Sequence, residues 1–244
     1  MTANHRDDHP AALLPLLRSS AESLLKTANA LTGEEVHAPS SLPGWTRAHV
    51  LTHLARGADS RVRLLTSART GADLPQYPDE QTRAREIDQG ARRDADAVRV
   101  DLAESLEQVL SAVAHHPDDA WDTPVQWLAT GPRPVRGVAT SLLRELEVHH
   151  VDLAADYTPE DWPPRFVALE LPLAVRQLRR DPQMPSLRLR ADEDQVVHPF
   201  GDGRDPMVTG RAAALLGWLT GRSDGRDLTV EPAAPLPVIP AWKR

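Results

Sequence analysis

Residues 142–153 read LLRELEVHHVDL, and this stretch combines a helical pattern with a high density of ionisable side chains. Its leucines and valines recur at helical spacing, which predicts an amphipathic helix. On such a helix Glu145 and His149 lie one turn apart and project from the same face. A carboxylate and an imidazole in this arrangement can ligate a divalent metal, by the same geometry as the two histidines of an HExxH zinc motif. An isolated pair of this kind is more often a solvated, salt-bridging surface, so the metal interpretation needs a further ligand elsewhere.

The sequence supplies a histidine on another expected helix. Residues 45–55 read WTRAHVLTHLA, and Thr46 follows a Pro-Gly break in a position suited to cap the helix. His53 lies beside Val50 and Leu54 on the apolar stripe, whereas His49 lies nearer its edge. A lone histidine on an apolar face is usually a satisfied core residue. A buried carboxylate–imidazole pair on a facing helix would nevertheless need a partner, and His53 points in the right direction.

Four long apolar stripes predict a four-helix bundle for the first part of the chain. We expect these helices over roughly 11–31, from 46 onward, 94–114 and 135–156, with a shorter helix starting near 82 and Gly33 ending the first. In such bundles metal sites are built from inward side chains on facing helices.

The composition changes at residues 157–164, YTPEDWPP, which predicts a domain boundary. Beyond it we expect helices at about 166–180 and 210–220, and short strands near 187–190, 196–198, 207–209 and 228–230. The predicted fold class is therefore α+β with two domains: a helical bundle over 1–158 and a small α/β domain over 159–244.

Composition limits the functions open to the chain. With 244 residues, 41% of them hydrophobic, it is long enough for a sizeable core, and its net charge of −7 argues against non-specific nucleic-acid binding. It shows no membrane-spanning run and no signal pattern, so we expect a cytoplasmic protein. Cysteine is absent, which excludes disulfides and thiolate zinc sites. Any sulfur chemistry must therefore be brought by a small molecule.

Taken together, the stretches at 45–55 and 144–153 resemble the two metal-ligand helices of the DinB-like thiol-transferase superfamily. The sequence VTG at 208–210, followed by LLGWLTGR at 215–222, resembles the second domain of one branch, the mycothiol-dependent maleylpyruvate isomerases. The resemblance covers essentially the whole chain in order.

The resemblance implies a DinB-like bundle that binds a divalent metal, usually zinc, through His53, Glu145 and His149, followed by a sterol-carrier-like domain. It also implies that two arginines hold a dicarboxylate substrate, and Arg83 and Arg222 match those positions. Without the family match, each arginine would be taken as a surface residue. One departure is His150, where an apolar residue is more usual, although the one-turn spacing from Glu145 favours His149 as the ligand.

The chemistry of these residues agrees with the implied activity. Two histidines and a glutamate leave a coordination position open, as in catalytic zinc sites, and zinc deprotonates a bound thiol. The expected function is a cis–trans isomerase that uses mycothiol, a low-molecular-weight thiol, to convert maleylpyruvate into fumarylpyruvate. The alternatives are a mycothiol S-transferase acting on another electrophile and a non-catalytic metal-binding regulatory module.

Overall fold

The computed structural model describes residues 9–194, 196–202 and 206–242. By its internal contacts the chain divides into two units, Met1–Ala155 and Asp156–Arg244. None of the described helices is both long enough and apolar enough to cross a membrane.

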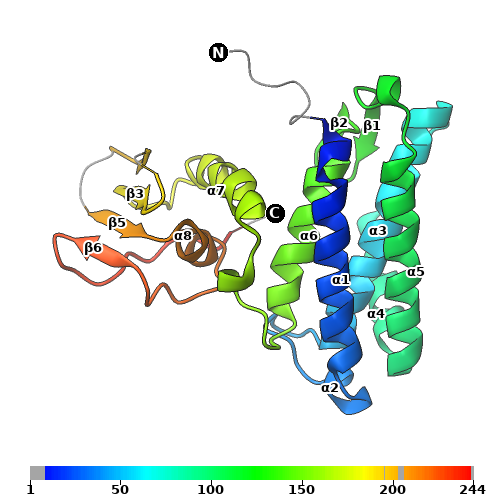
Figure 1. The fold of residues 1–244 in the computed structure, drawn as a ribbon, viewed down its shortest axis with the longest axis horizontal. Helices are drawn as coiled ribbons and strands as arrows, with labels where there is room; N and C mark the ends of the chain where they lie inside the picture. Colours follow the sequence, from blue (N-terminus) through cyan, green and yellow to red (C-terminus); the bar gives the residue numbers. More distant parts are fainter. Residues whose placement is uncertain (1–8, 195, 203–205, 243–244) are drawn as a thin grey trace. The chain divides into compact units, whose positions relative to one another are not determined.

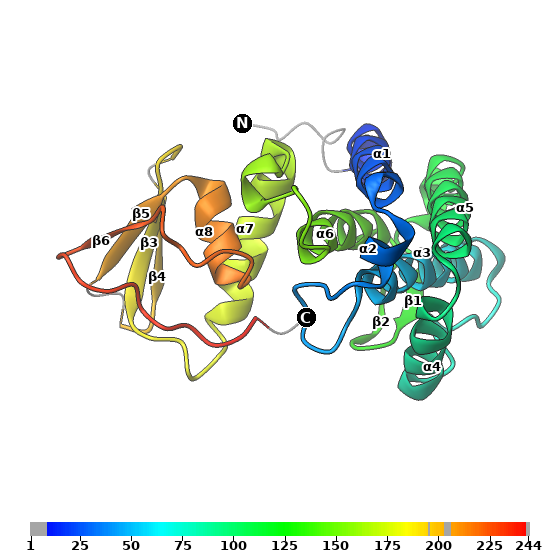
Figure 2. The same ribbon diagram turned by 90° about the horizontal axis from the view of Figure 1, so that it is seen from below.

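Four long helices form the first unit: α1 (Leu14–Ala30), α3 (Arg47–Thr70), α5 (Ala95–Ala114) and α6 (Gly137–Asp152). Helices α1 and α3 each pack against both α5 and α6, which closes the bundle (Figures 1 and 2). The helices pack because their apolar stripes face one another and leave water. The stripes contribute fully buried leucines, among them Leu17, Leu24, Leu51, Leu64, Leu102, Leu106, Leu142 and Leu146.

Shorter elements connect the long helices. A turn of 3-10 helix, η1 (Pro10–Leu13), precedes α1, and helix α4 (Glu80–Ala91) follows α3. After α5, a second 3-10 turn, η2 (Asp118–Ala120), leads into an antiparallel hairpin of β1 (Pro124–Trp127) and β2 (Gly131–Pro134). The prediction that Gly33 simply ends the first helix is incomplete, since a short helix α2 (Gly33–His37) begins there. Thr32 and Glu35 form a capping box at its start, a local signal that the apolar periodicity does not carry.

Helix α4 lies very close to α3, and a glycine makes this approach possible. A Cβ atom added at Gly90 would stand 2.4 Å from Cγ2 of Thr52, which is itself buried on α3. No side chain fits in that space, so Gly90 sets the distance between the two helices. The same contact fixes where the start of α4, with Arg83, lies relative to His53.

The start and end of α3 follow the sequence signals. The Thr46 hydroxyl accepts a hydrogen bond from the backbone N–H of His49, as expected of an N-cap residue. Gly71 ends the helix with φ +72°, a left-handed conformation that favours glycine. Between them α3 runs for 24 residues, long enough to carry His53 and, two turns later, Arg61.

The second unit is a four-stranded sheet with two helices. Its strands are β3 (Leu187–Ala191), β4 (Val197–Phe200), β5 (Met207–Gly210) and β6 (Thr229–Glu231), in the order β4-β3-β5-β6. Strands β3 and β5 are parallel and the other neighbours antiparallel. Helix α7 (Pro164–Leu178), preceded by η3 (Pro159–Asp161), packs on α8 (Ala212–Leu219), and both lie on the same side of the sheet (Figure 2). The predicted α+β class is confirmed.

Candidate metal centre

Two facing helices bring three potential ligands together. His53 comes from α3, and Glu145 and His149 come from successive turns of α6. Nε2 of His53 lies 2.9 Å from Oε2 of Glu145 and 2.9 Å from Nε2 of His149, and the last two atoms are 3.4 Å apart. Both histidines are buried, and Glu145 is only partly accessible.

This spacing fits a divalent metal. Ligand atoms at zinc distances of 2.0–2.1 Å in tetrahedral geometry stand roughly 3.3 Å from one another. Two imidazole nitrogens 2.9 Å apart also cannot both present lone pairs or both present protons, so a proton or a cation must lie between them. Within the described ranges, His53, Glu145 and His149 form the group whose donor atoms all lie within 4.8 Å of one another, as a shared metal requires.

Asp152 fixes the ring of His149. Its Oδ2 lies 2.9 Å from Nδ1 of His149, and both side chains are buried. The Ser41 hydroxyl donates to Oδ1 of Asp152 at 3.2 Å, which holds the carboxylate. A carboxylate at Nδ1 keeps the proton there and leaves the Nε2 lone pair facing Glu145 and His53, the usual arrangement behind a metal-ligating histidine.

Glu145 is held in its ionised form. Burial would raise the pKa of Glu145, but its contacts with His149 and His53 and the charge of Arg61 hold it well below its usual value. Nη2 of Arg61 lies 3.6 Å from Oε1 of Glu145 and donates to the Ser141 hydroxyl at 2.6 Å. The carboxylate is therefore charged and oriented at neutral pH, as a metal ligand must be.

Arg61 was not identified as a site residue from the sequence. The side chain is buried and donates to the carbonyl of Gly57 at 2.8 Å. A Cβ atom at Gly57 would lie 3.2 Å from Nη1 of Arg61, so the glycine leaves room for the guanidinium. An arginine on an apolar stripe one turn after a glycine is the signal that could have revealed it.

His53 is neutral and contacts Trp45 and Arg83 in addition to the other two potential ligands. Burial lowers the pKa of His53 to about 4, helped by His149 and Arg83 and opposed by Glu145. The Trp45 ring lies against its imidazole, with centroids 5.6 Å apart. Nη2 of Arg83 lies 3.0 Å from Nδ1 of His53 on the side away from the other ligands, so the structure brings the predicted Arg83 to the cluster.

The neighbouring histidines lie elsewhere. Nδ1 of His49 accepts from the backbone N–H of Thr46 at 3.2 Å, as part of the cap of α3. Nε2 of His150 lies 2.7 Å from the Thr27 hydroxyl of α1, on a different side of α6 from Glu145. Glu147, which the sequence suggests is not a metal ligand, lies one turn before His150, is buried and accepts a hydrogen bond from the Ser20 hydroxyl of α1.

Arg222 belongs to the second unit and is described by its contacts there. It follows Gly221, whose φ of +72° ends α8 as the sequence predicts. The half-buried guanidinium donates to the carbonyl of Thr220 at 2.6 Å and lies over the Trp242 ring, 5.8 Å from its centroid. Its predicted place in the site remains a prediction.

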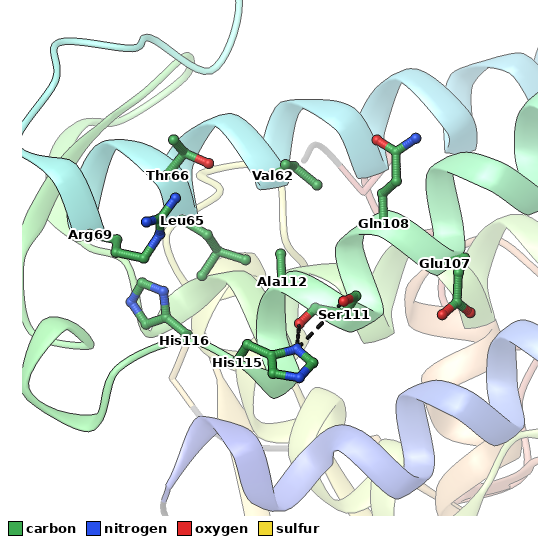
Figure 3. Close-up of a pocket in the computed structure, with 10 residues that line it drawn as sticks. All are labelled: Val62, Leu65, Thr66, Arg69, Glu107, Gln108, Ser111, Ala112, His115 and His116. Carbon is green, nitrogen blue, oxygen red and sulfur yellow. Dashed lines mark hydrogen bonds between the residues drawn. The ribbon is translucent and has the colours of Figure 1, made fainter.

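A separate groove of about 710 Å³ lies between α3 and α5 (Figure 3). Its lining includes Leu65 and Arg69 from α3, Ser111 from α5, and the following His115 and His116, but none of the predicted site residues. His116 is buried, and its Nε2 has no hydrogen-bond partner among the residues that the structure describes. Burial lowers the pKa of His116.

Comparison with known proteins now identifies the family. The family described as the mycothiol maleylpyruvate isomerase N-terminal domain matches residues 4–154. Among solved structures, the chain is similar to the crystal structure of the mycothiol-dependent maleylpyruvate isomerase (TM-score 0.89) and to that of a histidine-to-alanine mutant of it (TM-score 0.88). Both are 25% identical over 99% of this chain and 100% of the other chain. No curated protein matches. Because the family match spans more than half of the chain, the protein belongs to the mycothiol maleylpyruvate isomerase N-terminal domain family.

Proposed function

We propose that this protein is a mycothiol-dependent isomerase that converts maleylpyruvate into fumarylpyruvate at a divalent metal held by His53, Glu145 and His149. The observation that carries the proposal is the triangle of donor atoms with sides of 2.9, 2.9 and 3.4 Å, inside a family of that activity. The similarity to mycothiol-dependent maleylpyruvate isomerase along the full length of both chains supports the substrate and the thiol.

The donor set suits a catalytic metal more than a structural one. Two imidazoles and one carboxylate leave a tetrahedral ion with one position open. A divalent metal held by these residues would supply a Lewis acid that lowers the pKa of a thiol. The Asp152 carboxylate favours the proton of His149 on Nδ1, and Arg61 favours the charged form of Glu145, so these two residues already present lone pairs to a cation.

The isomerisation needs a thiolate from outside the chain, since the protein has no cysteine. The thiolate sulfur adds to one carbon of the cis double bond, and the electron pair moves onto the oxygen of the conjugated carbonyl as an enolate. The former double bond is now single and rotates. Return of the electron pair expels the thiolate and leaves the trans product, so atoms and electrons balance without an oxidant. Arg83 and Arg222 are proposed to bind the carboxylate and enolate oxygens, which guanidinium groups do bidentately and without losing charge.

The test is to supply zinc-loaded protein with mycothiol and maleylpyruvate and to follow fumarylpyruvate. We expect turnover with the thiol and none after the thiol has been dialysed away, while the zinc content stays constant. Turnover at an undiminished rate without thiol would contradict the addition mechanism and favour metal-assisted enolisation. Turnover of other electrophiles but not of maleylpyruvate would make the protein an S-transferase on the same scaffold.

A further inference from the structure

The two histidines of the proposed metal site have partners of opposite kind at Nδ1. Nδ1 of His149 faces the carboxylate of Asp152, a hydrogen-bond acceptor. Nδ1 of His53 faces Nη2 of Arg83 at 3.0 Å. A guanidinium has only protons to donate and does not lose its charge, so Nδ1 of His53 must be the acceptor in this contact.

This contact determines where the proton of His53 lies. A neutral imidazole carries one proton, and with Nδ1 accepting from Arg83 that proton is on Nε2. There it faces Oε2 of Glu145 and Nε2 of His149, each 2.9 Å away. Both atoms are then acceptors, because a second proton on Nε2 of His149 could not face the first across 2.9 Å. A single proton on Nε2 of His53 thus accounts for both of its 2.9 Å contacts.

The same arrangement excludes a metal. His53 can ligate through Nε2 only when that nitrogen presents its lone pair, and the proton must then move to Nδ1. An N–H at Nδ1 would point directly at the N–H groups of Arg83. The contact between Arg83 and His53 and the bond between a metal and Nε2 of His53 are therefore alternatives.

We propose that Arg83 is a latch on the metal site: it holds His53 in the non-ligating tautomer, and metal loading releases its guanidinium. The inference rests on the proposed metal site and adds an order of events, because the released Arg83 can meet an anionic group only after the metal has bound. Its half-buried side chain starts in the first turns of α4 and lies against the ring of Tyr77, with Cζ 5.8 Å from the centroid. This aromatic surface can support the guanidinium in both positions.

If Arg83 holds His53 in this way, removing Arg83 should change the zinc affinity in the direction opposite to that expected for a residue behind a metal ligand. Loss of an ordinary partner behind a metal ligand weakens metal binding about 10- to 100-fold. Loss of Arg83 should instead strengthen it. Arg83→Gln should strengthen it most, since its amide oxygen can accept the new N–H of His53. Arg83→Met, which only removes the competing donor, should have a smaller effect.

The experiment measures the zinc affinity of the metal-free protein by competition with a chromophoric chelator. We expect about tenfold tighter binding for Arg83→Gln, the fold-change that one hydrogen bond of a charged group commonly represents. The matched control is Arg63→Gln: Arg63 lies over the same Tyr77 ring at 5.3 Å, but donates to the backbone carbonyl of Gln76 at 3.1 Å. The Arg63→Gln substitution removes the same charge but leaves the contacts of His53 unchanged, so the zinc affinity of this variant should stay close to that of the wild type.

A second measurement reads the tautomer directly. Nitrogen-15 NMR of the imidazoles should show the proton of His53 on Nε2 in the metal-free wild type, and on Nδ1 after zinc is added. Metal-free wild type with the proton on Nδ1, or weaker or unchanged zinc binding by both Arg83 variants, would overturn the latch while leaving the proposed isomerase intact. A wild-type protein that binds no zinc would overturn the metal site and the latch together.

Discussion

At the scale of single residues, the pair of Arg61 and Glu145 holds the first ligand of α6 in place. The guanidinium is buried and its neighbours are the Glu145 carboxylate, the Ser141 hydroxyl and a backbone carbonyl. Removing one partner of a buried ion pair leaves the other charge without compensation. We expect Arg61→Leu to lower the free energy of unfolding of the metal-free protein by about 3 kcal/mol, as urea denaturation would measure.

The control for this prediction is a double-mutant cycle. Glu145→Gln removes the charge that Arg61 compensates, so Arg61→Leu should cost less in that background. An equal cost with and without the Glu145 charge would show that Arg61 acts through packing alone.

His116 predicts a pH dependence of stability that does not involve the metal cluster. Burial and Arg69 lower the pKa of His116 in the folded protein, although Ala120 and Asp119 oppose the shift. Below the unfolded pKa of about 6.5, the unfolded chain therefore binds a proton that the folded protein resists, and stability falls as the pH falls. The side chain of Gln does not titrate, so the melting temperature of His116→Gln should fall less between pH 7 and pH 5 than that of the wild type.

The adjacent His115 provides the comparison, since it lines the same groove but is exposed (Figure 3). His115→Gln should follow the wild-type pH profile. If the two variants shift the profile equally, burial of His116 is not the cause.

At the scale of elements, the approach of α4 to α3 depends on the contact of Gly90 with Thr52. Gly90→Ala places a methyl group where only 2.4 Å is available, against the side chain of Thr52, which is buried and restricted in its rotamers. We expect a loss of about 1–3 kcal/mol in the free energy of unfolding. In a Thr52→Ala background the added methyl group has space and should cost clearly less. The same cost in both backgrounds would place the strain elsewhere.

The elements also show what the sequence could predict. Each long helix has an apolar stripe, from which its existence follows, and α3 and α5 also have capping residues, Thr46, Gly71 and Asp94, that mark their ends. The short helix α2 and the buried Arg61 do not follow from periodicity. The first depends on a capping box, and the second on the space that Gly57 leaves for a long side chain.

The candidate site could be predicted only in part. The one-turn spacing of Glu145 and His149 is local and fixed by helical geometry. The meeting of α3 with α6, and the contact of Arg83 with His53, are long-range packing results that no single stretch contains. From the sequence, only the resemblance of the whole chain to a family indicated that these residues belong to one site.

At the scale of the whole molecule, Arg222 gives the second unit a proposed role in the reaction. If its guanidinium binds the substrate more strongly in the transition state, Arg222→Ala should lower kcat/KM about 10- to 100-fold. Arg222→Lys keeps the positive charge but cannot bind a carboxylate bidentately, so its kcat/KM should lie between those of Arg222→Ala and the wild type. Zinc content and melting temperature should stay near the wild-type values in both variants.

Arg226→Ala is the matched control for Arg222. Arg226 lies in the same loop after α8, but it is exposed and paired with Asp224 at 2.7 Å. Its removal should leave kcat/KM unchanged. Normal turnover by Arg222→Ala would remove Arg222 from the reaction.

The central claim is that His53, Glu145 and His149 hold the metal on which the reaction depends, and zinc content per chain tests it most directly. His149 and His150 are adjacent and equally buried on α6, but His149 faces the cluster and His150 faces Thr27 of α1. Elemental analysis of folded protein should find about one zinc per chain in the wild type and in His150→Ala, and almost none in His149→Ala. Zinc retained by His149→Ala and lost from His150→Ala would contradict the account.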